Sequence, residues 1–94
     1  MAAEVTDETC GPVHITVRYF AAARAAAGSD SEQLTARPGA TVGELVDSLG
    51  GRSPGLARVL LRCSFLCDGI AVRDRAKPLQ GGNTIDVLPP FAGG

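Results

Sequence analysis

The strongest constraint on the fold is the alternation of apolar and polar residues between residues 13 and 20. Every second residue is a large apolar one: Val13, Ile15, Val17 and Tyr19. Because side chains on a strand point to opposite faces in turn, this pattern predicts a strand with one face in the core. Phe20 is an exception, since it falls on the face that carries His14, Thr16 and Arg18. The chain therefore needs a sheet that is covered on one side.

Three helices are expected after this strand. The alanine-rich run 21–27 predicts a short helix that ends at Gly28. Thr41 and Glu44 have the spacing of a capping box, and Ser53-Pro54 is a typical helix start. The helices at 41–49 and 53–60 carry apolar residues at helical spacing: Val42, Leu45, Val46 and Leu49, and then Leu56, Val59 and Leu60.

Further strands are expected at 32–37, 63–67, 70–72 and 84–88. Asp68-Gly69 predicts a two-residue hairpin between the second and third of these. The last strand turns Ile85 and Val87 inward and leaves Leu88 on the polar face. If strands 13–20 and 84–88 are parallel neighbours, Phe20 and Leu88 lie together at their carboxyl ends. Such an apolar patch predicts docking of a partner, against the alternatives of isolated exposed residues or cover by a loop.

The chain ends in a segment with unusual composition, which we call the C-terminal tail: Pro89, Pro90, Phe91, Ala92, Gly93 and Gly94. The prolines favour a stiff, extended exit from the last strand, and the two final glycines have no side chains. Chain ends are often frayed and without function. The stiff Pro89-Pro90 segment and the final glycines without side chains favour instead a tail that enters a narrow channel of another protein. Its free carboxylate is an anion and a poor electrophile until it is activated.

Charge and length exclude several functions. Ninety-four residues allow one small domain, expected at 13–88, with a disordered extension at 1–12. Nine basic and ten acidic residues give a net charge of −1, which provides no electrostatic footprint for nucleic acid. There is no apolar run of membrane-spanning length and no signal peptide, so we expect a cytoplasmic protein that binds no membrane.

No residues with the spacing of a catalytic or metal site stand out. His14 is the single histidine and is expected on an exposed strand face, without a partner for nucleophilic catalysis. Gly81-Gly82-Asn83 lacks the lysine of a phosphate loop. Asp68 and Asp86 are interpreted as a turn residue and a solvated strand residue. We therefore expect no activity from the chain alone.

The three cysteines are Cys10, Cys63 and Cys67. The spacing of the last two matches neither a zinc knuckle nor a thioredoxin-type pair. On a strand they share one face, where small buried thiols are common. Core packing is therefore favoured over redox chemistry.

Four segments together resemble a known family. They are Arg18–Arg24, Thr41–Leu45, Asp68-Gly69 and Val87–Gly94, and they occur in one order between about residues 13 and 94. In combination they resemble the small subunits of molybdopterin synthase, which are ubiquitin-like β-grasp sulfur carriers. Two departures are mild, because Asp68 stands where the family often has Asn, and Asn83 stands where Asp is usual.

The resemblance implies an α+β β-grasp fold with a mixed sheet of four to five strands and helices on one face. It implies that an adenylyltransferase of the ubiquitin-activating type uses ATP to activate Gly94. A sulfur donor enzyme then completes a Gly94 thiocarboxylate. The tail would deliver sulfur to cyclic pyranopterin monophosphate in the large subunit, and the chain itself would bind no cofactor or metal. Phe20, Arg24 and Leu88 match family positions at partner contacts.

Other functions stay open on the sequence. A sulfur carrier for thiazole or cysteine synthesis would have the same fold. The aromatic-Ala-x-x-Arg run argues against the thiazole type, whereas the cysteine type shares much of the tail. A ubiquitin-like modifier would form isopeptide bonds to lysines. A plain interaction module would tolerate loss of Gly93 and Gly94.

Overall fold

The computed structural model describes residues 12–90. The expected disorder of 1–12 therefore lies outside the described residues, apart from Pro12, and so does Cys10. The tail is described as far as Pro90, while Phe91, Ala92, Gly93 and Gly94 lie outside.

Five strands and three helices follow the order expected from the sequence, with boundaries that differ by a few residues at most. They are β1 (Val13–Tyr19), α2 (Ala21–Ala27), β2 (Ser31–Ala36), α3 (Val42–Gly50), α4 (Pro54–Leu60), β3 (Ser64–Cys67), β4 (Ile70–Ala71) and β5 (Thr84–Leu88).

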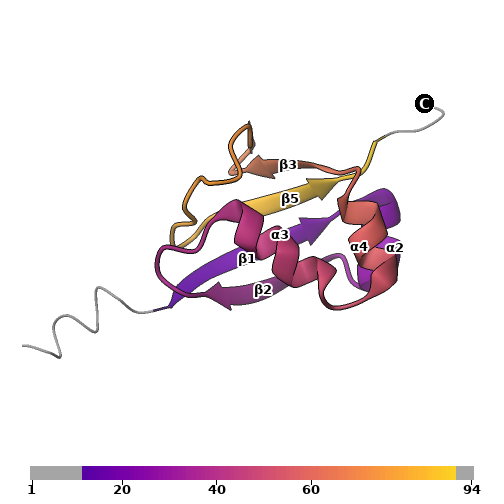
Figure 1. Ribbon diagram of the computed structural model, residues 1–94, viewed down its shortest axis with the longest axis horizontal. Coiled ribbons are helices and arrows are strands. Elements are labelled where there is room, and N and C mark those ends of the chain that lie inside the picture. The colour runs from indigo at the N-terminus through magenta and orange to yellow at the C-terminus, as the bar shows by residue number, and fades with distance from the viewer. Residues whose placement is uncertain (1–11, 91–94) are drawn as a thin grey trace, which may run out of the picture.

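The strands form one mixed sheet in the order β2-β1-β5-β3-β4 (Figure 1). β1 and β5 are parallel, and the other neighbouring pairs are antiparallel. The three helices lie on one side of this sheet (Figure 1). This is the β-grasp arrangement, so the expected fold class, strand number and helix placement are confirmed.

The core lies between that side of the sheet and the helices. β1 contributes Ile15, Val17 and Tyr19, each exposed by 2% or less, and β5 contributes Ile85 and Val87. The helices contribute Ala23 and the residues expected from their spacing, Val42, Leu45, Val46, Leu49, Leu56 and Leu60, whereas Val59 is only partly buried. Apolar periodicity therefore identified the core face of β1 and α3 correctly, while Leu34 and Ala36 of β2 are only partly buried and both residues of β4 are exposed.

The helix starts are capped as expected, with one difference. The Thr41 hydroxyl accepts a hydrogen bond from the Glu44 backbone N–H at 3.2 Å, and the Ser53 hydroxyl accepts one from the Leu56 N–H at 3.1 Å. The Glu44 carboxylate does not complete the capping box. It binds the Arg37 guanidinium instead, at 2.7 and 2.8 Å.

The β3–β4 hairpin turns at Asp68 and Gly69, which both have positive φ, as a type I′ turn requires. Asp68 does more than turn the chain. Its carboxylate accepts hydrogen bonds from Asn83 Nδ2 at 2.7 Å and from the Thr84 N–H at 2.8 Å. Asn83 Oδ1 in turn accepts from the Gln80 N–H at 2.7 Å. The two residues that depart from the resembled family are thus bonded to each other.

Candidate functional site

The tail leaves the sheet where β1 and β5 end side by side. Tyr19 lies opposite Val87 in the parallel register, and the Phe20 N–H donates to the Val87 carbonyl at 3.3 Å. We call the side of the sheet that carries no helices its open face. Because side chains alternate along each strand, Phe20 and Leu88, which come directly after Tyr19 and Val87, lie on this open face. Phe20 is 38% exposed and Leu88 is half-buried. The structure therefore brings these two predicted docking residues together, directly before Pro89.

Beside Phe20, the open face carries an ion pair that the sequence analysis misread. Asp86 was expected to be solvated, but it is only 7% exposed. The Arg18 guanidinium donates to both of its oxygens, Nε to Oδ1 at 2.7 Å and Nη2 to Oδ2 at 3.0 Å. The same guanidinium carbon lies 5.5 Å from the centre of the Phe20 ring. Cross-strand register explains the error, because Arg18 lies directly opposite Asp86 and covers it. The pair holds Arg18 against Phe20 and so helps to orient the exposed ring.

On the covered face, the same end of the sheet has a polar cluster. The Tyr19 hydroxyl donates to Glu32 Oε2 at 2.6 Å, and Arg52 pairs with the same carboxylate. The hydrogen bond from Arg52 lowers the pKa of Glu32, and burial together with Glu32 raises the pKa of Tyr19 well above its usual value. These contacts fix the end of β1 against β2 and the loop after α3.

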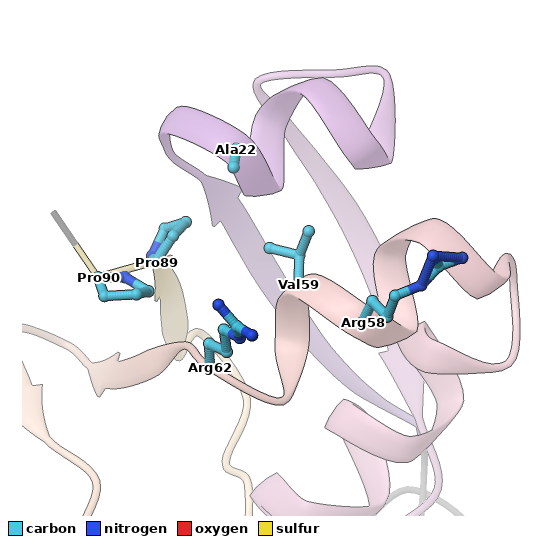
Figure 2. Close-up of a pocket in the computed structure, with 6 residues that line it drawn as sticks. All are labelled: Ala22, Arg58, Val59, Arg62, Pro89 and Pro90. Carbon is cyan, nitrogen blue, oxygen red and sulfur yellow. The ribbon is translucent and has the colours of Figure 1, made fainter. Parts of the chain in front are cut away.

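A hollow of about 350 Å³ lies on the helix side of the tail base (Figure 2). We call it the α2–α4 groove, and its walls are Ala22, Arg58, Val59, Arg62, Pro89 and Pro90. Pro89 is buried and Pro90 is exposed. The sequence analysis did not identify this groove. Arg58 lies on α4 and Arg62 lies in the turn that follows it, and their position beside the tail depends on the packing of α4, which the sequence alone does not reveal.

Arg24, the remaining predicted contact residue, lies on α2. Its guanidinium is 3.5 Å from Asp30 Oδ1, and both side chains are well exposed. This loose surface pair leaves Arg24 accessible at the tail end of the molecule.

The cysteines and the possible metal ligands do not form part of this site. Burial is the main cause that raises the pKa of the Cys63 and Cys67 thiols, which disfavours the reactive thiolate. Cys67 is buried in the core, and the Cys63 thiol donates to the Val59 carbonyl. Within residues 12–90, no three His, Cys, Asp or Glu side chains gather as metal ligands do. No helix in that range is long and apolar enough to cross a membrane.

Comparison with known proteins identifies related chains. The model of the ThiS family matches residues 17–94. The molybdopterin synthase sulfur carrier subunit of Chlamydomonas reinhardtii is 30% identical over 83 residues, covering 87% of this chain and all of the relative. A Pyrococcus furiosus structure described as molybdopterin converting factor, subunit 1, has 25% identity and a TM-score of 0.76, covering 84% of this chain and 99% of that one.

Two further structures widen the comparison. Small archaeal modifier protein 1 of Haloferax volcanii has 26% identity and a TM-score of 0.73, covering 84% of this chain and 99% of that one. A ubiquitin of Caldiarchaeum subterraneum, 16% identical with a TM-score of 0.59, shares the fold, with 89% of this chain and 100% of that chain covered. The ubiquitin-like form of the β-grasp fold is thereby confirmed.

Proposed function

This chain belongs to the ThiS family, and from that premise we propose that it is the sulfur carrier subunit of a molybdopterin synthase. The curated relative that carries this name is covered over its whole length. The observation that carries the proposal is the position of the tail. The tail, whose sequence includes Gly93-Gly94, begins at Pro89 directly after β5, next to Leu88 and near Phe20.

Gly94 carries the proposed chemistry. An adenylyltransferase of the ubiquitin-activating type joins its carboxylate to AMP from ATP and releases pyrophosphate. Hydrosulfide, supplied by a donor enzyme, then attacks the acyl carbon and displaces AMP, and after loss of a proton the product is a Gly94 thiocarboxylate. Glycine suits this position because no Cβ crowds the acyl carbon or a narrow channel around it. ATP serves the activating enzyme, and this chain holds no cofactor of its own.

The large subunit of the synthase is the proposed acceptor partner. Phe20 and Leu88 supply an apolar contact at the entrance to its channel, with Arg24 at the rim. The tail, from Pro89 to Gly93, spans the distance to the bound pyranopterin. The large subunit provides the catalytic groups, so this chain acts as a sulfur donor rather than as an enzyme alone.

A ubiquitin-like protein modifier is the second candidate. It is favoured by the similarity to small archaeal modifier protein 1. Such a modifier uses the same activated terminus but forms an isopeptide bond with a lysine amine. Adducts of higher mass that require Gly94 would distinguish it from a sulfur carrier. Carriers for cysteine or thiazole synthesis would form the same thiocarboxylate and differ in the acceptor.

The test is the intact mass of the chain after incubation with ATP, a sulfur source and its activating enzyme. We expect one carboxylate oxygen to be replaced by sulfur, with the change localised to Gly94. A chain without Gly94 is the control. It should fold normally, because β5 ends before the tail, and should lose sulfur transfer. An unchanged mass of the full chain with a competent activating enzyme, or full activity of the shortened chain, would contradict the proposal.

A further inference from the structure

The α2–α4 groove combines apolar walls with two positively charged side chains. Ala22 of α2 and Val59 of α4 line it beside the base of the tail, where Pro90 forms an exposed wall (Figure 2). At about 350 Å³ the hollow is at the lower end of the size range of ligand pockets. It can therefore hold one aromatic or branched aliphatic side chain of a partner.

The charged residues of the groove are both arginines. Arg58 lies on α4 and Arg62 in the turn after it, and both side chains are exposed. Within residues 12–90 neither guanidinium pairs with a carboxylate, whereas four other arginines of that range do: Arg18, Arg24, Arg37 and Arg52. Two arginines beside an apolar hollow are thus available to carboxylates of another protein.

Other hollows of the described chain contain charges of both signs. Three of them combine carboxylates with cations: Asp68 and Asp74 with Arg73 and Lys77, Glu44 with Arg37 and Arg52, and Asp47 with Arg75. The whole chain has a net charge of −1, so the excess of positive charge at the α2–α4 groove is local. This groove is therefore complementary to an acidic segment that also carries an apolar side chain.

The groove is continuous with the base of the tail. Pro89 is buried, Pro90 is exposed, and both are walls of the groove. A protein that encloses the tail has to cover Pro90, and it then lies next to Val59 and Arg62. A small anion would bind the arginines but leave the apolar hollow empty. The position of the groove therefore favours the protein that takes up the tail as its occupant.

We propose that an acidic segment of the large subunit docks in the α2–α4 groove when the tail is taken up. One apolar side chain of that segment fills the hollow between Ala22 and Val59, and neighbouring carboxylates bind Arg62 and Arg58. The large subunit thereby holds the base of the tail from two sides, at this groove and on the open face. The inference rests on the proposed function and adds a second contact surface to it.

The test is titration calorimetry of the large subunit with the native chain and with two groove variants. Ala22→Leu fills the hollow with a side chain of this protein and should weaken binding by about tenfold. Arg62→Glu replaces an ion pair by a repulsion and should weaken binding by about fivefold. The loss in Arg62→Glu should shrink at high sodium chloride concentration, because salt screens exposed charges.

The matched controls are Ala25→Leu and Arg73→Glu. Ala25 is exposed on the same helix as Ala22, and Arg73 is exposed beside a different hollow, near Asp68. Neither residue lines the α2–α4 groove, so both controls should bind with native affinity. Urea denaturation should show that all four variants are folded, because each substitution is at an exposed side chain.

The inference requires both groove variants to weaken binding more than their controls do. Native affinity in either groove variant, or an equal loss in its control, would overturn the inference and leave the proposed function standing. Self-association of the free chain that Ala22→Leu abolishes would assign the groove to a second copy and would also overturn it. If the native chain does not bind the large subunit, the proposed function is itself contradicted, and the inference with it.

Discussion

The two ends of the β1–β5 strand pair differ in the contacts that their residues make. At the amino end of β5, side-chain and backbone groups form hydrogen bonds with one another. Asp68, Asn83 and Thr84 are linked by hydrogen bonds, and the Gly82 N–H donates to the His14 carbonyl at 2.8 Å. At the carboxyl end, the open face presents Phe20 beside the start of the tail.

The difference separates stability from recognition. Polar side chains that are satisfied internally add rigidity, but they offer little to a partner. An apolar side chain held at a strand end contributes little to folding, and it gains free energy when a partner covers it. Substitutions at the amino end should therefore change unfolding, and those at the carboxyl end should change binding.

The largest effect on stability is expected from Asn83→Asp. This change places a second carboxylate against Asp68, where Asn83 Nδ2 now donates at 2.7 Å. We expect a loss of about 2 kcal/mol in the free energy of unfolding, because a hydrogen bond becomes a repulsion. Urea denaturation at neutral pH measures it. The loss should shrink as pH falls, because protonation of one carboxyl restores a donor.

Adding Asp68→Asn to that variant should restore the lost stability. The amide introduced at position 68 would accept from the Thr84 N–H and donate to the carboxylate introduced at position 83. That carboxylate would still accept from the Gln80 N–H. Every hydrogen bond of the present cluster is thereby kept with the roles exchanged. A double variant that is no more stable than Asn83→Asp would show that the cluster is not the source of the rigidity.

At the carboxyl end, Phe20→Asp should weaken binding to the large subunit by about tenfold or more. Folding stability should change little, because Phe20 is the N-cap residue of α2 and an acidic side chain suits that position. Titration calorimetry and urea denaturation give the two quantities. Ile70→Asp is the control, since Ile70 is an apolar residue with 73% exposure on β4. Equal loss of affinity in both variants would remove the docking role of Phe20.

Leu88→Asp provides an independent check of the same surface. Leu88 is half-buried, so some loss of stability is expected together with the loss of affinity. Unchanged affinity in this variant would limit the contact to Phe20.

The smallest effect on the free energy of unfolding is expected from a change in pH. It acts through Glu32 and Tyr19, which lie at the carboxyl end of β1 on the face of the sheet that the helices cover. The pKa of Glu32 is lowered in the folded chain, so its contribution is present above its unfolded pKa of about 4.3 and is lost as pH falls through the lower folded pKa. The pKa of Tyr19 is raised, so its contribution is present below about pH 10 and is lost as pH rises through the folded pKa.

For Glu32 we expect a change below about 1 kcal/mol, because its partner Arg52 is partly exposed. Urea midpoints between pH 3 and pH 7 should fall on the acid side in the native chain and should be flatter in Glu32→Gln. Identical pH profiles would show that this cluster does not titrate with folding.

The fold was largely predictable because its signals are local or periodic. The two-residue period of β1 placed Val17 in the core, and Asp68-Gly69 placed the hairpin turn. Parallel pairing of β1 and β5 was the one long-range assumption needed to bring Phe20 to Leu88. These predictions required no knowledge of side-chain partners.

The rest depended on contacts between distant residues. Asp86 is buried because Arg18 lies opposite it on another strand, which alternation alone cannot reveal. Ala21 adopts a positive φ of 50°, for which alanine carries no sequence signal. The groove beside Pro89 exists because α4 packs against α2. In each case the deciding neighbour is remote in sequence.

The position of β5 has a mechanical consequence. It lies in the interior of the sheet, bonded to β1 on one side and to β3 on the other. A partner that draws in the tail pulls on β5 along its own axis. Such a load falls on both rows of hydrogen bonds at once, in shear, whereas an edge strand pulled sideways would lose its bonds one at a time. If a partner draws in the tail as proposed, the domain that anchors it should therefore stay folded.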